Sequence, residues 1–279
     1  MRIGFIGAGK VGFSLGKYFS ENGMEITGYF SRSENSAREA AEFTDSEYFD
    51  SCEKLINASD AVFLTVPDGA ILETYLAFPK DTLAGKRLCH CSGALSSDTA
   101  FPDIAKYKAK GTSIHPLFPV SSKTESYKEL GSAFFCIEGD CAEEWSGILS
   151  GMGNPTRIIS SDIKSRYHAA CSVASNLVCG IMAESVRLLG QCGFTEKEAL
   201  TALEPLAMSN IRHIFEVGAE KALTDPVERN DVSTVKKHIV SIDDETGLAV
   251  YKAVSRKLTE IAEKRHSESD YSEMNEILK

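Results

Sequence analysis

Short apolar runs alternate with amphipathic stretches over the first 160 residues of the chain. The apolar runs predict strands at 2–6, 25–30, 61–66, 87–91, 111–114, 133–137 and 156–159. Helical spacing between them predicts helices at roughly 10–22, 35–43, 68–78 and 141–152. Strands that alternate with helices form βαβ units, so this part of the chain is expected to be an α/β domain with a mostly parallel, doubly wound sheet.

Beyond residue 160 the strand pattern disappears and long helical periods replace it. Helices are predicted at 161–191, 195–222, 232–238 and 244–265, the second of them begun by a capping box of Thr195 and Glu198. The chain is therefore expected to divide into an α/β domain at 1–160 and an all-α domain at 161–279. Long apolar helices beside an α/β domain often pair with a second copy, so a homodimer is also expected.

Three glycines lie between the first predicted strand and the first predicted helix, as G-x-G-x-x-G at Gly7, Gly9 and Gly12. In a dinucleotide-binding unit the first glycine permits the turn, the second leaves room for a pyrophosphate, and the third lets helix and strand pack closely. Lys10 and Val11 begin the helix whose free N–H groups would face the phosphates. The first domain is therefore expected to be a cofactor-binding Rossmann domain.

The end of the second predicted strand indicates which dinucleotide is bound. An NAD site usually has an acidic residue there, but this chain has Ser31, Arg32 and Ser33, and Glu34 comes late. A permanently charged guanidinium suits a 2′-phosphate. We therefore expect NADP (NADPH) rather than NAD. Ser33 could also cap the following helix, and the two interpretations are compatible.

Charge and composition limit the classes of partner that the protein is expected to bind. The net charge is −10, without a Lys/Arg-rich run, which argues against nucleic acid and anionic membrane surfaces. No uninterrupted apolar run approaches the roughly 20 residues of a membrane span. None of the eight cysteines falls in a C-x-x-C pair, so no metal site is expected. Free thiols in apolar segments and a chain that starts with a strand indicate a cytoplasmic protein without a signal peptide.

Small and polar residues follow several predicted strands, at the sheet edge where α/β proteins bind ligands. Val66 and Pro67 are expected to contact the cofactor, with Ser92 and Gly93 near the nicotinamide and the substrate. His115 could bind the substrate, or it could be a buried histidine whose hydrogen bonds are made with the backbone. The remaining histidine of this edge, His90, is expected to face into the sheet.

A stripe of polar side chains runs along the helix predicted at 161–191, formed by Lys164, His168, Ser172, Ser175 and Asn176. Burying an ammonium and an imidazole costs free energy unless partners or a ligand satisfy them. Lys164 is a candidate proton donor or carboxylate clamp, and His168 is the competing donor. Asn176 would fix a hydroxyl or carboxylate, and Ser172 would contact the substrate. The alternative is a set of interhelical hydrogen bonds at a domain or dimer interface.

A second polar segment precedes the helix predicted at 232–238. Arg229 could form a bidentate pair with a substrate carboxylate, and Thr234 could face the same cleft. The alternative for Arg229 is a structural pair with Asp231, which is itself a candidate helix cap.

Together these segments resemble a bacterial family that joins a Rossmann-like domain to a C-terminal domain of unknown function, number 2520. The pieces that carry the resemblance are Gly7-Ala-Gly9-Lys-Val-Gly12, Val66-Pro-Asp68, His90-Cys-Ser92-Gly93, His115-Pro116, Lys164-x-x-Tyr-His168 with Ser175-Asn176, and Leu223-Thr-Asp-Pro226 with Arg229-x-Asp231. The family is similar in architecture to ketopantoate reductases and pyrroline-5-carboxylate reductases.

The resemblance implies an NADPH-dependent reductase of a small 2-oxo acid, an enzyme of the CH–OH/C=O couple. Its best single substrate is 2-dehydropantoate (ketopantoate), which would place the protein in pantothenate biosynthesis. An imine reductase resembling pyrroline-5-carboxylate reductase is a second hypothesis. A non-catalytic NADP-binding sensor or scaffold is a third, because a fold does not fix a function.

Overall fold

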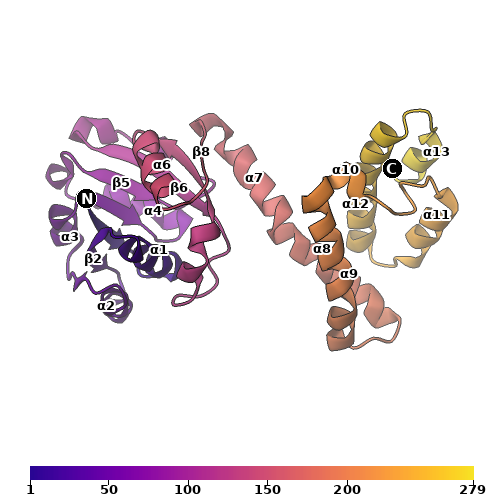
Figure 1. The fold of residues 1–279 in the computed structure, drawn as a ribbon, viewed down its shortest axis with the longest axis horizontal. Coiled ribbons are helices and arrows are strands. Elements are labelled where there is room, and N and C mark those ends of the chain that lie inside the picture. Colours follow the sequence, from indigo (N-terminus) through magenta and orange to yellow (C-terminus); the bar gives the residue numbers. More distant parts are fainter. The chain divides into compact units, whose positions relative to one another are not determined.

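The computed structural model describes residues 1–279, which form two compact units, Met1–Ser172 and Val173–Lys279 (Figure 1). The first contains one eight-stranded sheet in the order β3-β2-β1-β4-β5-β6-β7-β8. Its strands are β1 (Arg2–Ile6), β2 (Glu25–Phe30), β3 (Glu47–Tyr48), β4 (Ala61–Leu64), β5 (Arg87–His90), β6 (Lys110–Leu117), β7 (Phe134–Gly139) and β8 (Thr156–Ile158).

All neighbouring strands pair in parallel except β6 and β7. The chain builds β1 to β3 outward in one direction and returns to add β4 on the other side of β1, so the strand order reverses there. The helices of this unit, before α7 (Lys164–Ala174), are α1 (Lys10–Glu21), α2 (Glu34–Phe43), α3 (Cys52–Ala58), α4 (Asp68–Leu76), α5 (Ser97–Ala100) and α6 (Ala142–Gly151). The predicted doubly wound α/β fold is confirmed.

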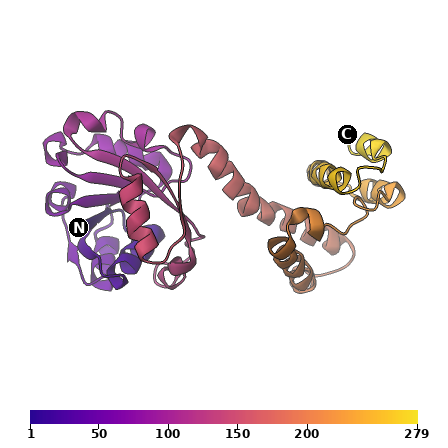
Figure 2. The same cartoon turned by 45° about the horizontal axis from the view of Figure 1, so that its top comes forward.

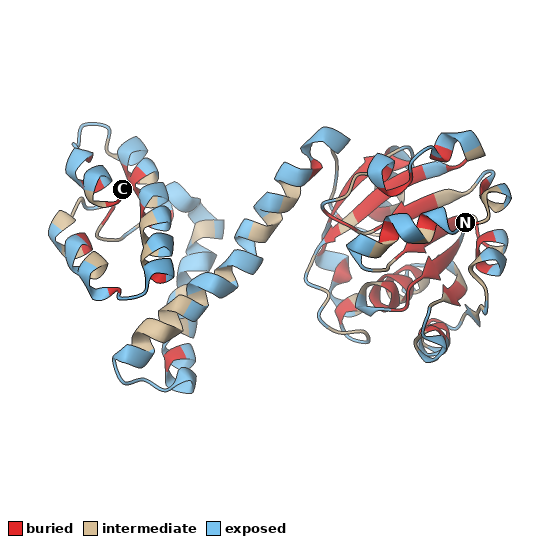
Figure 3. Cartoon of the chain, turned by 180° about the vertical axis from the view of Figure 1, so that it is seen from behind, coloured by how far each residue is buried: buried red, intermediate tan, exposed pale blue.

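The core of the first unit lies on both faces of the sheet. Every residue of β4 is fully buried, as its unbroken apolar run predicts for a central strand covered on both sides. Trp145 of α6 is also fully buried and packs against Phe19 and Phe63. Figure 3 shows the central strands of the sheet coloured mainly as buried.

The second unit is all-helical, as predicted, with α8 (Asn176–Gln191), α9 (Glu196–Val217), α10 (Ala219–Ala222), α11 (Val232–Ser241), α12 (Glu245–Arg265) and α13 (Ser272–Ile277) (Figure 2). Thr195 and Glu198 form the predicted capping box. Two predicted helices are interrupted. The turn at Ser175 separates α7 (Lys164–Ala174) from α8, and Gly218, with φ of 84°, separates α9 from α10.

Packing divides the chain after Ser172, so most of α7, including Lys164 and His168, belongs to the first compact unit. The boundary predicted at residue 160 marks instead where the alternation of strands and helices ends, since β8 ends at Ile158.

The helical stretch Ser161–Gln191 is long and apolar enough to cross a membrane, judged by length and composition alone. Its most apolar window has a mean hydropathy of 1.4, and none of that window is buried. The search for uninterrupted apolar runs did not find this stretch, because polar residues interrupt each run. They lower the mean hydropathy of the stretch only a little. One such helix is weak evidence for a membrane span.

Candidate functional site

The glycine turn after β1 has the conformation that dinucleotide binding requires. Gly7 has φ of 105°, and a Cβ there would lie 2.7 Å from the carbonyl oxygen of Thr65. A Cβ on Gly12 would lie 2.5 Å from the carbonyl oxygen of Gly7, so α1 packs directly on the turn. No atom lies within 4 Å of the Cβ position of Gly9. The second glycine therefore opens onto free space at the N-terminus of α1.

A cavity of about 500 Å³ lies at the carboxyl ends of β1, β2 and β4, where the strand order reverses. This is the place where open α/β sheets bind their ligands. The predicted cofactor residues that line the cavity are Gly7, Gly9, Ser31, Arg32, Val66 and Pro67. The sequence reasoning did not select the other lining side chains, which include Ser36, Cys52, Thr65, Glu73, Thr74 and Phe78.

Four further predicted cofactor residues, Lys10, Val11, Gly12 and Ser33, follow lining residues in the sequence without lining the cavity themselves. Lys10, Val11 and Gly12 form the first turn of α1, which follows directly after the lining residue Gly9. Ser33 is the N-cap of α2 and accepts a hydrogen bond from the backbone N–H of Ser36 at 3.3 Å. The capping interpretation of Ser33 is therefore confirmed.

These residues fit NADP. The free space at Gly9 and the N–H groups of α1 suit a pyrophosphate. The exposed Arg32 follows the strand that contacts the ribose in such sites, and it lines the same cavity. A guanidinium in that place suits a 2′-phosphate.

A second cluster lies at the carboxyl ends of β5 and β6, where the imidazoles of His115 and His168 converge on Gly93. A Cβ on Gly93 would lie 2.7 Å from Cδ2 of His168 and 2.9 Å from Nε2 of His115. The two rings are 6.2 Å apart between centroids, at an interplanar angle of 74°. Only a glycine at position 93 lets both rings approach this strand end so closely.

Tyr167 completes this cluster. Its hydroxyl lies 2.7 Å from Nδ1 of His115. Sequence reasoning quoted Tyr167 within the motif Lys164-x-x-Tyr-His168 but gave it no role, although the i+3 spacing from Lys164 places it on the same side of α7 as the predicted stripe. Burial, with added effects of Lys164 and His168, lowers the pKa of His115 to about 4. The imidazole of His115 is therefore neutral at physiological pH.

Lys164 points into the first unit and is 2 % exposed. Its Nζ donates hydrogen bonds to the carbonyl oxygen of Ser92 at 3.2 Å and to Oγ of Ser113 at 2.5 Å. Burial lowers the pKa of this ammonium. Its hydrogen bonds tie α7 to the ends of β5 and β6, next to the imidazole cluster.

Ser92 builds the turn after β5 with its side chain. Its hydroxyl donates to Oδ2 of Asp68 at 2.6 Å and accepts from the N–H groups of Ala94 and Leu95. Because these partners use the hydrogen-bonding capacity of the hydroxyl, the side chain of Ser92 supports the turn and is not free to bind a ligand.

His90 is fully buried within the sheet, as expected. Its Nδ1 accepts a hydrogen bond from the N–H of Ser92 at 3.2 Å. Burial, reinforced by the positive charge of Lys164, lowers the pKa of His90 to about 3. His90 is therefore a neutral ring within the sheet that supports the turn after β5 through this hydrogen bond.

The remaining predicted residues lie at or beyond the end of the first unit. Ser172 is its last residue, and Asn176 is the exposed first residue of α8. Arg229 is exposed and lines a shallow pocket of about 320 Å³. Thr234 donates its hydroxyl to Oδ2 of Asp231 at 2.7 Å, so both residues form the cap of α11.

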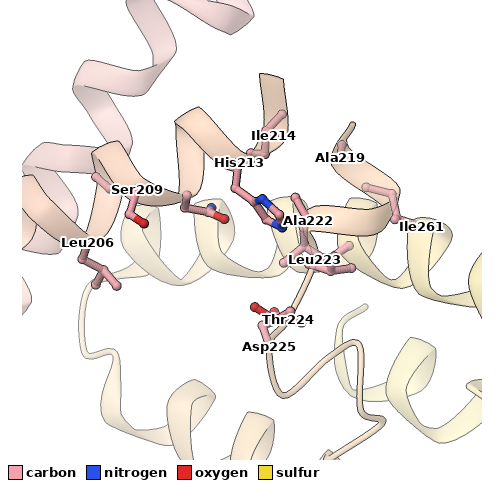
Figure 4. A pocket seen from close by; sticks show the side chains of 13 residues that line it. Leu206, Ser209, His213, Ile214, Ala219, Ala222, Leu223, Thr224, Asp225 and Ile261 are labelled. Carbon is pink, nitrogen blue, oxygen red and sulfur yellow. The ribbon is translucent and has the colours of Figure 1, made fainter. Parts of the chain in front are cut away.

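A cavity of about 650 Å³ in the second unit lies among α9, α10 and α12. Figure 4 shows Ser209 and His213 of α9 on one side, with Leu223 and Asp225 near the opposite wall. Neither Arg229 nor Thr234 lines this cavity, so the sequence did not point to it.

Two family models each match part of the chain. Residues 2–92 are similar to the family described as NADP oxidoreductase, coenzyme F420-dependent, and the predicted cofactor, NADP, agrees with that description. Residues 133–258 match the domain of unknown function 2520, as the motifs indicated. No curated protein matches the chain.

Solved structures share the fold over nearly the whole chain. Protein TM1727 from Thermotoga maritima is 26% identical, with a TM-score of 0.74 over 95% of this chain and 99% of that one. An imine reductase from Streptomyces aurantiacus is 15% identical, with a TM-score of 0.65 over all of both chains. A reductive aminase from Aspergillus terreus, in complex with NADPH and ethyl levulinate, is 15% identical with a TM-score of 0.65 over 92% of each chain.

Proposed function

We propose that this protein is an NADPH-dependent reductase of a small 2-oxo acid, with 2-dehydropantoate as the leading substrate. The observation that carries the proposal is the convergence of His115 and His168 on Gly93. Proton donors at a strand end of a dinucleotide-binding sheet are what the reduction of a carbonyl requires.

The bound nicotinamide supplies the hydride, and the protein must supply a proton and stabilise developing negative charge on the carbonyl oxygen. We assign the proton to His168, because it is partly exposed at the cluster, whereas Lys164 is buried with its hydrogen bonds directed into the protein. His115 is neutral and acts as a fixed hydrogen-bond donor. The ammonium of Lys164 contributes positive charge behind the turn, which favours an alkoxide over a cation.

Arg229 and Asn176 are the candidates for holding the substrate carboxylate, since both side chains are exposed in the second unit. Ser172 remains a candidate substrate contact. Thr234 is a weaker candidate than the sequence implied, because its hydroxyl is engaged with Asp231.

Imine reduction is the second candidate, favoured by the fold likeness to an imine reductase and a reductive aminase. An iminium substrate carries positive charge that is lost on reduction. The positive charge of Lys164 beside the imidazole cluster disfavours such a substrate. This electrostatic argument ranks the oxo acid first.

A substrate panel tests the proposal. NADPH oxidation would be followed with 2-dehydropantoate, other 2-oxo acids, cyclic imines, and ketones mixed with amines, and NADH would replace NADPH as a control. Fastest turnover with a 2-oxo acid supports the proposal. Turnover limited to imines would replace it with the second candidate, and tight NADPH binding without any turnover would identify a sensor or scaffold.

We also propose that a second copy of the chain covers the exposed apolar side chains of α8 and α9. Leu177, Ile181, Leu206 and Phe215 are 42 to 86 % exposed, and large apolar side chains exposed on two neighbouring helices are typical of an interface. The molar mass by light scattering should be that of a dimer, and Phe215→Asp should shift it toward the monomer. A monomeric wild-type protein would contradict this.

A further inference from the structure

Tyr167 is placed to control the imidazole of His115. It lies on α7, one residue before His168, and its ring meets the ring of His115 edge to face, with centroids 5.7 Å apart at 86°. The hydroxyl lies 2.7 Å from Nδ1. Nε2 is then the ring nitrogen turned toward Gly93, because it lies 2.9 Å from the Cβ position of that glycine.

The chemistry of the two partners decides which one donates. A neutral imidazole has one N–H and one nitrogen lone pair, and a hydroxyl can donate or accept. Burial raises the pKa of Tyr167 far above its usual value, so its proton is always present. The hydroxyl also lies beside the thiols of Cys136 and Cys171. A nitrogen lone pair is a better acceptor than a thiol sulfur, so the hydroxyl proton goes to Nδ1.

We propose that Tyr167 is a positioning residue that holds His115 in the tautomer protonated at Nε2, with that N–H presented at Gly93 to the substrate oxygen. The role of this N–H toward the substrate rests on the proposed reductase function. The tautomer itself follows from the hydrogen bond between Tyr167 and His115 and does not depend on that function. The second ring nitrogen of a histidine generally fixes the tautomer through its own hydrogen bond. Here a tyrosine hydroxyl provides that bond, and the N–H is ready before substrate arrives.

The tautomer can be measured without any substrate. In protein labelled with 15N-histidine, Nδ1 of His115 should resonate as an unprotonated nitrogen and Nε2 as a protonated one, assigned with a His115→Gln variant. In Tyr167→Phe the two nitrogens should move toward averaged shifts as both tautomers become populated. A wild-type His115 protonated at Nδ1, or an unchanged spectrum in Tyr167→Phe, would overturn the proposal.

Kinetics give the second readout. On the substrate selected by the panel, Tyr167→Phe should lower kcat at least about tenfold, while affinity for NADPH changes less than about twofold. Tyr18→Phe is the matched control, because it also removes a buried hydroxyl with one side-chain partner, Asn154 at 2.6 Å, outside the cluster. An equal loss of kcat in the two variants would assign Tyr167 a merely structural role. Absence of turnover in the wild type would refute the reductase and leave the tautomer measurement valid.

Discussion

Acid should destabilise the first unit through His90. This ring is fully buried, and burial together with the charge of Lys164 lowers its pKa to about 3. In the unfolded chain the same imidazole has a pKa of about 6.5. Above pH 7 the ring is neutral in both states and contributes nothing. As the pH falls below 6.5, the unfolded chain binds a proton that the folded protein does not accept, so stability is lost until the folded ring titrates near pH 3.

The size of this loss follows from the two pKa values. At pH 5 the unfolded ring is almost fully protonated and the folded ring almost fully neutral, which costs about 2 kcal/mol relative to pH 8. His115, whose pKa is lowered to about 4, adds a second loss of about 2 kcal/mol over the same range. Wild-type protein should therefore lose roughly 4 kcal/mol from these two residues between pH 8 and pH 5.

The measurement uses urea unfolding at both pH values, followed by tryptophan fluorescence. Trp145 is the only tryptophan of the chain and lies fully buried in the first unit, so its emission reports this unit. The variant is His90→Asn, because an amide oxygen can replace Nδ1 as acceptor for the N–H of Ser92. The variant should lose about 2 kcal/mol less than the wild type between pH 8 and pH 5. Equal losses in the two proteins would refute the reasoning.

Three further substitutions test other parts of the site. Arg32→Ala should weaken NADPH binding at least about tenfold while leaving NADH binding unchanged, because only NADPH carries the 2′-phosphate; equal weakening in a binding titration would remove Arg32 from that role. Gly93→Ala brings a methyl group within 2.9 Å of both imidazoles and should lower turnover at least about tenfold with NADPH affinity retained, so full turnover would show that the rings do not act there. Lys164→Met leaves the hydroxyl of Ser113 without its donor and removes one of the two donors to the carbonyl of Ser92, and it should destabilise the unit by about 1–3 kcal/mol. Urea unfolding at the wild-type midpoint would mean that these hydrogen bonds contribute nothing net.

The fold was predictable where apolar periodicity is strong. The run of Val62 to Val66 could only be a central strand, and the capping box at Thr195 located the start of α9. The two-residue strand β3 and the short helix α3 were not predicted, because so few residues do not show a clear apolar period. The break at Ser175 escaped as well, since neither glycine nor proline stands there to indicate it.

The cofactor cavity was predictable in part because its chemistry depends on local backbone. Gly7 and Gly9 act through a turn that a few neighbouring residues define, and Arg32 follows a strand end at a typical distance. The rest of the cavity wall comes from α4 and neighbouring segments through side chains such as Thr74 and Phe78, which carry no motif. Their place depends on how the helices pack on the sheet, and a single sequence does not encode that in any local pattern.

Lys164 illustrates what helical spacing leaves open. Spacing gives the direction in which a side chain leaves the helix axis, and Lys164 and His168 do leave α7 on the same side. Spacing does not show how far a side chain extends or which groups it contacts. The long chain of Lys164 extends to Ser92 and Ser113 and ends 2 % exposed, whereas the shorter His168 stops beside Gly93 and stays partly exposed. The two residues therefore lie in different surroundings: buried Lys164 ties α7 to the turn after β5, and His168 is the one that we propose as the proton donor.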